Sequence, residues 1–174
     1  MKNQVVRLKL LAILLLTFSQ LSACGFHLRG QNEFILPFEV LYIKSANNYT
    51  PFIAELKRTV IATGTQLAES PDAAQLTLDV VSETTGKQIL SLSGAGRVRE
   101  YQLRYVVSFR AFDKQQQEWL APDEIVLQRN LSYDDEYVLA KEQEEVLLYQ
   151  NMRSDAVQQI MRRLTRVRPP RSQQ

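Results

Sequence analysis

Apolar side chains recur at every second position between Tyr101 and Ala111, and this stretch constrains the fold more than any other. The apolar positions are Tyr101, Leu103, Tyr105, Val107, Phe109 and Ala111, and the positions between them include Gln102, Arg104, Ser108 and Arg110. Successive side chains of a β-strand point to opposite faces of the sheet. The pattern therefore predicts a strand in a sheet that is buried on one face and polar on the other.

Shorter strand patterns accompany this one. Apolar runs or alternation occur at residues 40–43, at 76–80 with a continuation at 89–90, at 125–133 and, as a short candidate, at 26–28. Two turn-rich stretches, Ser93–Gly96 and Lys114–Gln117, separate the later strands. These three later strands are expected to form antiparallel hairpins.

Two helices are expected, each with one apolar side. Asn48 or Thr50 can cap the first helix, with Pro51 in its first turn and Gly64 at its end. Its apolar positions are Phe52, Ile53, Leu56, Val60 and Ile61. The second helix follows the polar stretch 134–136, and its stripe consists of Tyr149, Met152, Ala156, Ile160 and Leu164, widened by Val157 and Met161.

The order of elements is therefore strand, helix, three strands, helix. Two helices suffice to cover one face of the sheet, so the sequence predicts an α+β fold. It is a two-layer sandwich with a mixed four-stranded sheet and two helices on one face. The first strand–helix–strand crossover should be parallel. Phe109 and Ile160 should both be buried in the core. The other sheet face, which carries Gln102, Arg104, Arg110, Thr77 and Asp79, is either solvated or meets a partner.

Residues 1–23 have the layout of a bacterial export signal. Lys2, Arg7 and Lys9 precede an apolar run, and Leu21-Ser22-Ala23 leads into Cys24, the one cysteine of the chain. The run is about half of the ~20 residues that a membrane-spanning helix needs, which disfavours a retained anchor. The Leu21–Cys24 string resembles a lipobox, so we expect cleavage before Cys24 and acylation of its thiol. The alternative is an unmodified cysteine that is either buried or free.

Cleavage changes the charge of the protein. Three of the 21 Lys and Arg residues precede Cys24 whereas all 19 Asp and Glu follow it, so the formal charge changes from +2 to −1. A nucleic-acid partner then has no support. We expect a signal peptide at 1–23, a single domain at 24–168 and a flexible basic tail at 169–174. The basic residues from Arg162 onward either complement the end of the helix or contact an anionic surface.

Catalytic patterns are weak. Gly94-Ala95-Gly96 lacks the third glycine of a dinucleotide fingerprint. Asp134-Asp135-Glu136 fits a helix start better than a cation site, because it lacks a glycine turn and spaced ligands. With one His and one Cys, a His-rich or multi-Cys metal site is excluded. We expect no enzyme, no metal and no cofactor besides the lipid on Cys24.

The mature chain resembles the family of LPS-assembly lipoproteins called LptE, formerly RlpB. The strings that carry the resemblance are Cys24–Arg29, directly after the lipobox, then Arg99–Leu103, Val138–Glu142 and Arg162–Leu164. They occur in the family's order over roughly residues 24–168. The start motif is fairly specific, whereas the other three strings are weak singly.

The resemblance implies a function. Members of the family plug the LptD β-barrel in the outer membrane, help it assemble and bind lipopolysaccharide. Gly25 after the acylated cysteine, where Asp would favour retention, implies sorting to the outer membrane. Lys141 matches a lysine of the family, and Arg97 and Arg99 lie beside the Gly94–Gly96 turn, so these three are the expected lipopolysaccharide contacts. Other members have an aromatic–Arg pair where this chain has Ser93-Gly94.

A second function stays open. A lipoprotein that scaffolds another envelope complex, such as a secretin pilot or a barrel-assembly accessory, would keep the anchor, the fold and the polar sheet face without binding lipopolysaccharide. The partners found in detergent-extracted outer membranes distinguish the two. An enzyme would need a pocket with several titratable groups.

Overall fold

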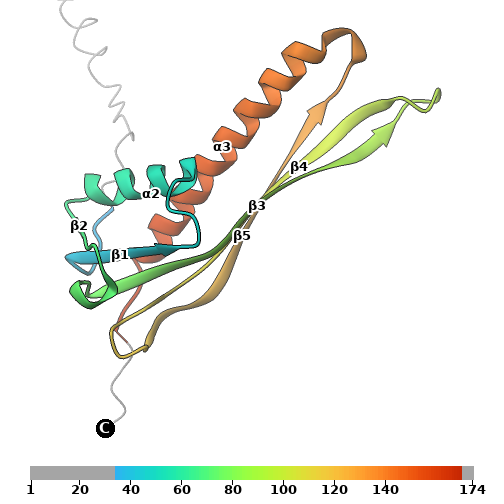
Figure 1. Ribbon diagram of the computed structural model, residues 1–174. Coiled ribbons are helices and arrows are strands. Elements are labelled where there is room, and N and C mark those ends of the chain that lie inside the picture. Colours follow the sequence, from blue (N-terminus) through green and yellow to red (C-terminus); the bar gives the residue numbers. More distant parts are fainter. Residues whose placement is uncertain (1–33, 170–174) are drawn as a thin grey trace, which may run out of the picture. The chain divides into compact units, whose positions relative to one another are not determined.

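The computed structural model describes residues 34–169, and its centre is a mixed five-stranded sheet (Figure 1). The sheet order is β2-β1-β3-β4-β5. The strands are β1 (Val40–Ser45), β2 (Gln66–Leu67), β3 (Leu76–Leu92), β4 (Val98–Phe112) and β5 (Glu118–Ser132). The helices are α2 (Pro51–Ala62) and α3 (Val138–Leu164), with short 3₁₀ turns η2 (Pro71–Ala73) and η3 (Asp135–Tyr137).

The predicted architecture is confirmed, with one correction to the strand count. Both helices cover the same face of the sheet, β1 pairs with β3 in parallel, and β3, β4 and β5 pair as antiparallel hairpins (Figure 1). The sheet has five strands rather than four, because β2 pairs in parallel with the edge of β1. The candidate strand at 26–28 lies outside the described residues. No helix within residues 34–169 is long and apolar enough to cross a membrane.

The capping residues explain where α2 begins and ends. The Thr50 hydroxyl accepts a hydrogen bond from the Ile53 backbone N–H at 3.2 Å, and Pro51 occupies the first helical position, where its missing N–H costs nothing. Of the two candidate caps, Asn48 and Thr50, it is therefore Thr50 that caps the helix. After the helix, Gly64 takes a φ of 85°, a left-handed conformation that a residue with a side chain adopts only with strain.

The core lies between the sheet and the two helices, and β4 and α3 contribute the faces that their apolar patterns predict. Leu103, Tyr105, Val107, Phe109 and Ala111 are all buried on the helical side of β4. They face a buried stripe of α3, formed by Met152, Ala156, Val157, Ile160, Met161 and Leu164. Phe109 is 1% exposed and Ile160 is 0% exposed, which confirms that both are in the core.

A bulge at Val81 reverses which residues of β3 face the helices. Before it, Leu78 and Val80 pair with Ala111 and Phe109, so even-numbered residues face the helices. The register shifts between Val80 and Ser82, and afterwards Glu83, Thr85, Lys87 and Ile89 pair with the helix-facing residues of β4. One inserted residue moves every later side chain to the other face. The second half of β3 thus turns polar residues toward the helical side.

The domain has two ends that differ in packing. We call the packed end the part built from α2, β1, β2, residues 76–80 of β3, residues 105–112 of β4 and residues 152–164 of α3. The extended end consists of residues 82–92, 98–104 and 128–132 of β3, β4 and β5 and residues 138–151 of α3. In Figure 1 the β3–β4 hairpin and the start of α3 run on well past α2. Many large apolar side chains of the extended end are exposed, among them Ile89, Leu90, Leu92, Leu139, Val146 and Leu147.

The sheet face opposite the helices is less solvated than its polar sequence suggests. Thr77 and Asp79 are buried on it. Asp79 is the middle of a cross-strand row, because Lys44 of β1 and Arg110 of β4 pair directly with it. The Asp79 carboxylate accepts hydrogen bonds from Lys44 at 3.4 Å and from Arg110 at 3.2 Å. Two longer side chains therefore cover and neutralise this carboxylate.

Candidate functional site

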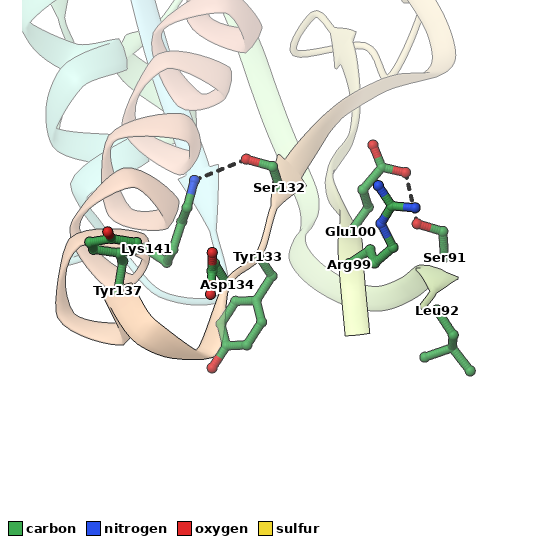
Figure 2. Close-up of a pocket in the computed structure, with 9 residues that line it drawn as sticks. All are labelled: Ser91, Leu92, Arg99, Glu100, Ser132, Tyr133, Asp134, Tyr137 and Lys141. Atoms are coloured by element: carbon green, nitrogen blue, oxygen red, sulfur yellow. Dashed lines mark hydrogen bonds between the residues drawn. The ribbon is translucent and has the colours of Figure 1, made fainter. Parts of the chain in front are cut away.

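A hollow of about 710 Å³ opens where β5 turns into α3, beside the start of β4. Its lining residues come from the tip of the β3–β4 hairpin and from the β5–α3 corner, and they are Ser91, Leu92, Arg99, Glu100, Ser132, Tyr133, Asp134, Tyr137 and Lys141. Figure 2 shows the two groups facing each other, with Lys141, Asp134 and Tyr137 on one wall and Arg99, Glu100 and Ser91 on the other.

The backbone of the sheet holds the two walls together. Glu100 pairs with Ser132 across β4 and β5 and with Ser91 across β3 and β4. The Tyr133 N–H extends the β5 ladder by donating to the Arg99 carbonyl at 2.8 Å. Main-chain hydrogen bonds between neighbouring strands therefore hold the two walls in a defined register. Leu131, the buried neighbour of Ser132, adds support from the core.

Asp134 fixes the corner between β5 and α3. Its Oδ1 atom accepts a hydrogen bond from the Glu136 backbone N–H at 3.0 Å, and its carbonyl accepts one from the Tyr137 N–H at 3.1 Å. The predicted helix-start role of this acidic stretch is thus correct for the short η3 turn that precedes α3. The turn places the Tyr137 side chain on the wall of the hollow.

Lys141 is held in place on the first turn of α3. Its ammonium group donates to the Ser132 hydroxyl at 2.9 Å and to Glu144 Oε2 at 2.8 Å, and the side chain is 20% exposed. The first contact ties the helix to the end of β5. The second is an ion pair between residues three positions apart on one helix, a geometry of modest strength. A ligand that binds Lys141 has to compete with Glu144.

Acidic groups balance the basic ones around the hollow. The lining contains two cations, Arg99 and Lys141, and two carboxylates, Glu100 and Asp134. Glu100 Oε2 accepts the Ser91 hydroxyl at 2.8 Å, which links neighbouring strands of the hairpin (Figure 2). The formal charge of the lining is thus zero. Neighbouring hydroxyls from Ser132, Tyr133 and Tyr137 add donors and acceptors.

The structure brings two of the predicted contact residues together and leaves one apart. Arg99 and Lys141 line the same hollow. Arg97 is exposed in the hairpin tip and is not part of the lining. There its backbone N–H donates to the Ser93 hydroxyl at 3.1 Å, and Gly96 takes a φ of 75° that closes the turn. Cys24, the predicted lipid attachment, lies outside the described residues.

Sequence reasoning missed the two carboxylates of the lining. The sequence pattern indicates only a helix start for Asp134 and suggests no role for Glu100. To find them, one would have needed the pairing of Ser91 with Glu100. That pairing depends on register shifts on both sides of Ser91, between Ile89 and Ser91 and between Ser91 and Leu92. A bulge leaves little trace in the residue types of an exposed hairpin tip.

A second polar cluster, at Lys87, lies next to the hollow and joins the hairpin to α3. The Lys87 ammonium group is 2.5 Å from Glu145 Oε2 and 4.2 Å from the centre of the Tyr101 ring. Tyr101 in turn packs edge-on against Tyr133 at 5.2 Å, which connects the cluster to the hollow. The hydrogen bond to Glu145 raises the pKa of Lys87, which partial burial opposes. The cluster clamps β3 to the first half of α3.

Metal ligands are sparse in this part of the chain. Within residues 34–169, no group of three or more His, Cys, Asp or Glu side chains is arranged to hold a metal ion. What the hollow offers is two cations, two carboxylates and several hydroxyls on a strand-supported frame. Such an arrangement can bind a charged, hydroxyl-rich group.

Fold and hollow together define a small α+β domain, with one helix-covered sheet and a recess lined by charged side chains at its less packed end. The chain belongs to the LptE family: the family model, described as lipopolysaccharide-assembly, matches residues 38–164. Two proteins named LPS-assembly lipoprotein LptE are similar along most of the chain. The one from Pectobacterium atrosepticum is 25% identical over 144 residues, covering 82% of this chain and 77% of that protein. The one from Yersinia enterocolitica is 25% identical over 165 residues, covering 94% and 77%.

Solved structures show the same fold. Lipoprotein B from Nitrosomonas europaea is similar with a TM-score of 0.68 and 39% identity, covering 81% of this chain and 90% of that one. A minor lipoprotein from Acinetobacter baumannii has a TM-score of 0.61 and 27% identity, covering 75% and 93%. The rare lipoprotein B from Shewanella oneidensis, at 23% identity and a TM-score of 0.65 over 72% of this chain and 92% of that one, agrees in fold.

Proposed function

We propose that this protein is a lipid-anchored lipoprotein of the outer membrane that plugs and helps assemble the LptD β-barrel and binds lipopolysaccharide for insertion into the outer leaflet. The observation that carries the proposal is the meeting of Arg99 and Lys141 in one hollow of a domain that belongs to a lipopolysaccharide-assembly family. Lipid A carries phosphates on a sugar backbone. Guanidinium and ammonium groups are the side chains that bind phosphate, and the hydroxyls of the lining suit a sugar.

Lipopolysaccharide binding is tested by charge reversal in the full-length protein, purified in detergent. Arg99→Glu together with Lys141→Glu should weaken binding more than about tenfold, because charge-assisted bonds to phosphate contribute roughly 1.5–3 kcal/mol each. The matched control is Arg58→Glu with Lys114→Glu, which reverses two exposed charges outside the lining and away from the hairpin tip. Binding is measured at two salt concentrations, since exposed phosphate contacts weaken with salt. Equal affinity of both double variants would remove the hollow from lipid binding.

The barrel partnership is supported by the surface of the domain. A large barrel has a polar lumen, so a plug needs a compact domain with a polar outer surface. The sheet face opposite the helices provides one, since Arg104, Gln128 and Asn130 are exposed on it. Co-purification from detergent-extracted outer membranes should recover a large barrel protein. Recovery of other envelope proteins alone would instead support the scaffold alternative, in which no lipopolysaccharide is bound.

The anchor is tested separately. Intact mass of the membrane-extracted protein should show loss of residues 1–23 and acyl groups on Cys24, and Cys24→Ser should release the protein from membranes. Two or more acyl chains are needed for stable anchoring. The folded domain should be unaffected, because its core residues begin at Phe38. A mature chain that starts elsewhere would contradict this part of the proposal.

A further inference from the structure

We infer that the hollow selects a zwitterionic headgroup, a phosphate that also carries an ammonium group as in phosphoethanolamine, over phosphate alone. The inference rests on the proposed function, because it names the headgroup class for the same site. It is drawn from the charges that surround the two cations rather than from the cations themselves.

Positive and negative side chains balance each other around the hollow. Each cation of the lining is matched by a carboxylate, Glu100 or Asp134, and Lys141 is also paired with Glu144 outside the lining. A bare phosphate would bring up to two negative charges into a site with no net positive charge. Like charges within a few ångströms repel each other at a partly buried position. A phosphate that brings its own positive charge avoids this repulsion.

The opposite charges are distributed over both walls of the hollow. Each wall of the hollow has one cation and one carboxylate: Lys141 and Asp134 on the corner side, Arg99 and Glu100 on the hairpin side (Figure 2). A ligand whose opposite charges are a few bonds apart can contact a cation of one wall and a carboxylate of the other at the same time. Phosphoethanolamine has this separation, since two carbons lie between its phosphate ester oxygen and its ammonium group.

Both carboxylates of the lining can accept a further hydrogen bond. Glu100 uses Oε2 for the Ser91 hydroxyl, and Asp134 uses Oδ1 for the Glu136 N–H. Among residues 34–169, the structure gives no donor to Glu100 Oε1 or to Asp134 Oδ2. Each carboxylate is therefore held in place by one oxygen while the other can accept a hydrogen bond from an ammonium group. The alternative is that Glu100 and Asp134 only stabilise the hairpin and the turn. In that case, removing their negative charge would not change which form of the ligand binds more tightly.

The experiment compares two forms of one lipopolysaccharide chemotype, with and without phosphoethanolamine on the lipid A phosphates. Binding to the full-length protein in detergent is measured for the parent, for Glu100→Gln with Asp134→Asn, and for a control that removes two negative charges nearby but outside the lining, Glu136→Gln with Glu142→Gln. The parent and the control should prefer the phosphoethanolamine form by roughly tenfold or more, as expected for one charge-assisted contact. In E100Q/D134N the preference should disappear, because binding of the unsubstituted form strengthens.

The same headgroup chemistry has a second source, the glycerophospholipids, and competition separates the two. Short-chain phosphatidylethanolamine and short-chain phosphatidylglycerol are each titrated against bound lipopolysaccharide. Displacement by the ethanolamine lipid alone would show that the hollow accepts the headgroup from either source. Displacement by neither would restrict it to lipopolysaccharide. Equal displacement by both would overturn the inference.

Failure of the inference and failure of the proposed function give different results. Equal affinity of the parent for both lipopolysaccharide forms, or an equal gain for both in E100Q/D134N, would show a hollow that binds anions without selecting the ammonium group. The proposed function would then stand, provided that R99E/K141E still loses binding. If that variant binds both forms like the parent, the hollow is not the lipid site at all.

Discussion

The packed end and the extended end are built from the same strands and the same long helix, yet they are stabilised differently. At the packed end, α2 and α3 cover the sheet together, and Phe52, Leu56 and Phe109 are essentially fully buried. At the extended end only α3 faces the strands, and its first half exposes large apolar side chains: Leu139 is 77% exposed. Continuous strands thus carry the candidate site to the end of the domain where fewer side chains are buried.

Polar contacts replace apolar packing toward the extended end. The Tyr105 hydroxyl donates to Glu83 Oε1 at 2.5 Å, and burial together with this bond raises the pKa of Tyr105. Farther along, Lys87 contacts Glu145, and Lys141 contacts Ser132. Regions with few buried apolar contacts open at low free-energy cost, and binding sites are often found in such regions. We therefore expect the extended end to open more readily than the packed end.

The largest effect that distinguishes the two ends should come from truncating the core. Phe109→Ala and Ile160→Ala should each lower the free energy of unfolding by roughly 2–5 kcal/mol, because each leaves a cavity at the sheet–helix interface. Leu139→Ala, which removes a comparable side chain at the extended end, should change it by no more than about 0.5 kcal/mol. Denaturant unfolding followed by circular dichroism measures all three. Equal losses would show that the ends do not differ in packing.

Hydrogen exchange should show the same contrast without a mutation. Amides of residues 83–91 should exchange roughly tenfold or more faster than those of residues 76–80 in the same strand, which corresponds to about 1.4 kcal/mol less opening free energy. The reason is that residues 76–80 are all buried, whereas most of 83–91 are exposed. Uniform protection along β3 would mean that the strand opens as a single unit with the core.

The sequence predicted the packed end better than the extended end, and the physical reason is burial. The alternation of β4 and the stripe of α3 exist because one side of each is in the core, so both were predictable. The two residues of β2 are too few to show a period. The bulge at Val81 left one trace, since the adjacent Val80 and Val81 interrupt the alternation. At the hairpin tip no buried face imposes a pattern.

Only the residues of the candidate site that the family resemblance covers could be predicted. The matched strings and the neighbouring turn point to Lys141 and Arg99, and both line the hollow. Arg97 was named on the same adjacency and lies outside it, because a tip side chain two residues away follows the turn rather than the sheet. Glu100 and Asp134 required the register of β4 and the turn of η3, which no local pattern encodes.

Removing the hydrogen bond between α3 and the hairpin should have a smaller effect than a core truncation. The Tyr149 hydroxyl donates to the Gly86 carbonyl at 2.8 Å, so Tyr149→Phe should cost about 1 kcal/mol of unfolding free energy. Tyr137→Phe is the control, because that ring is exposed and its hydroxyl donates to no acceptor within residues 34–169. Exchange at residues 83–91 should rise in Y149F and stay unchanged at 76–80. A rise at both ends would show that this bond supports the whole domain.

The ion pair between Lys87 and Glu145 should give the smallest effect, and pH can isolate it. The Glu145 hydrogen bond raises the pKa of Lys87 above its ordinary value of about 10.5. A raised lysine pKa contributes stability that is complete below the unfolded pKa and is lost as the pH rises through the folded pKa. Both side chains are partly exposed, so solvent screening limits the contribution to a few tenths of a kcal/mol.

The measurement is the difference in Tm between the parent and Glu145→Gln at pH 7 and again above the raised pKa of Lys87. The parent should be slightly more stable at pH 7, and the difference should vanish or reverse at the alkaline pH, where Lys87 is neutral in both proteins. Burial, together with the Glu145 carboxylate, also raises the pKa of Tyr149, which destabilises the fold at alkaline pH. The burial contribution is common to both proteins and cancels in the difference. The Glu145 contribution is present only in the parent and lowers its stability at alkaline pH, so it cannot account for a stabilisation that persists there. A difference that persists above the lysine pKa would assign the stabilisation to Glu145 packing rather than to the ion pair, and the extended end would then be less dependent on charge than its contacts indicate.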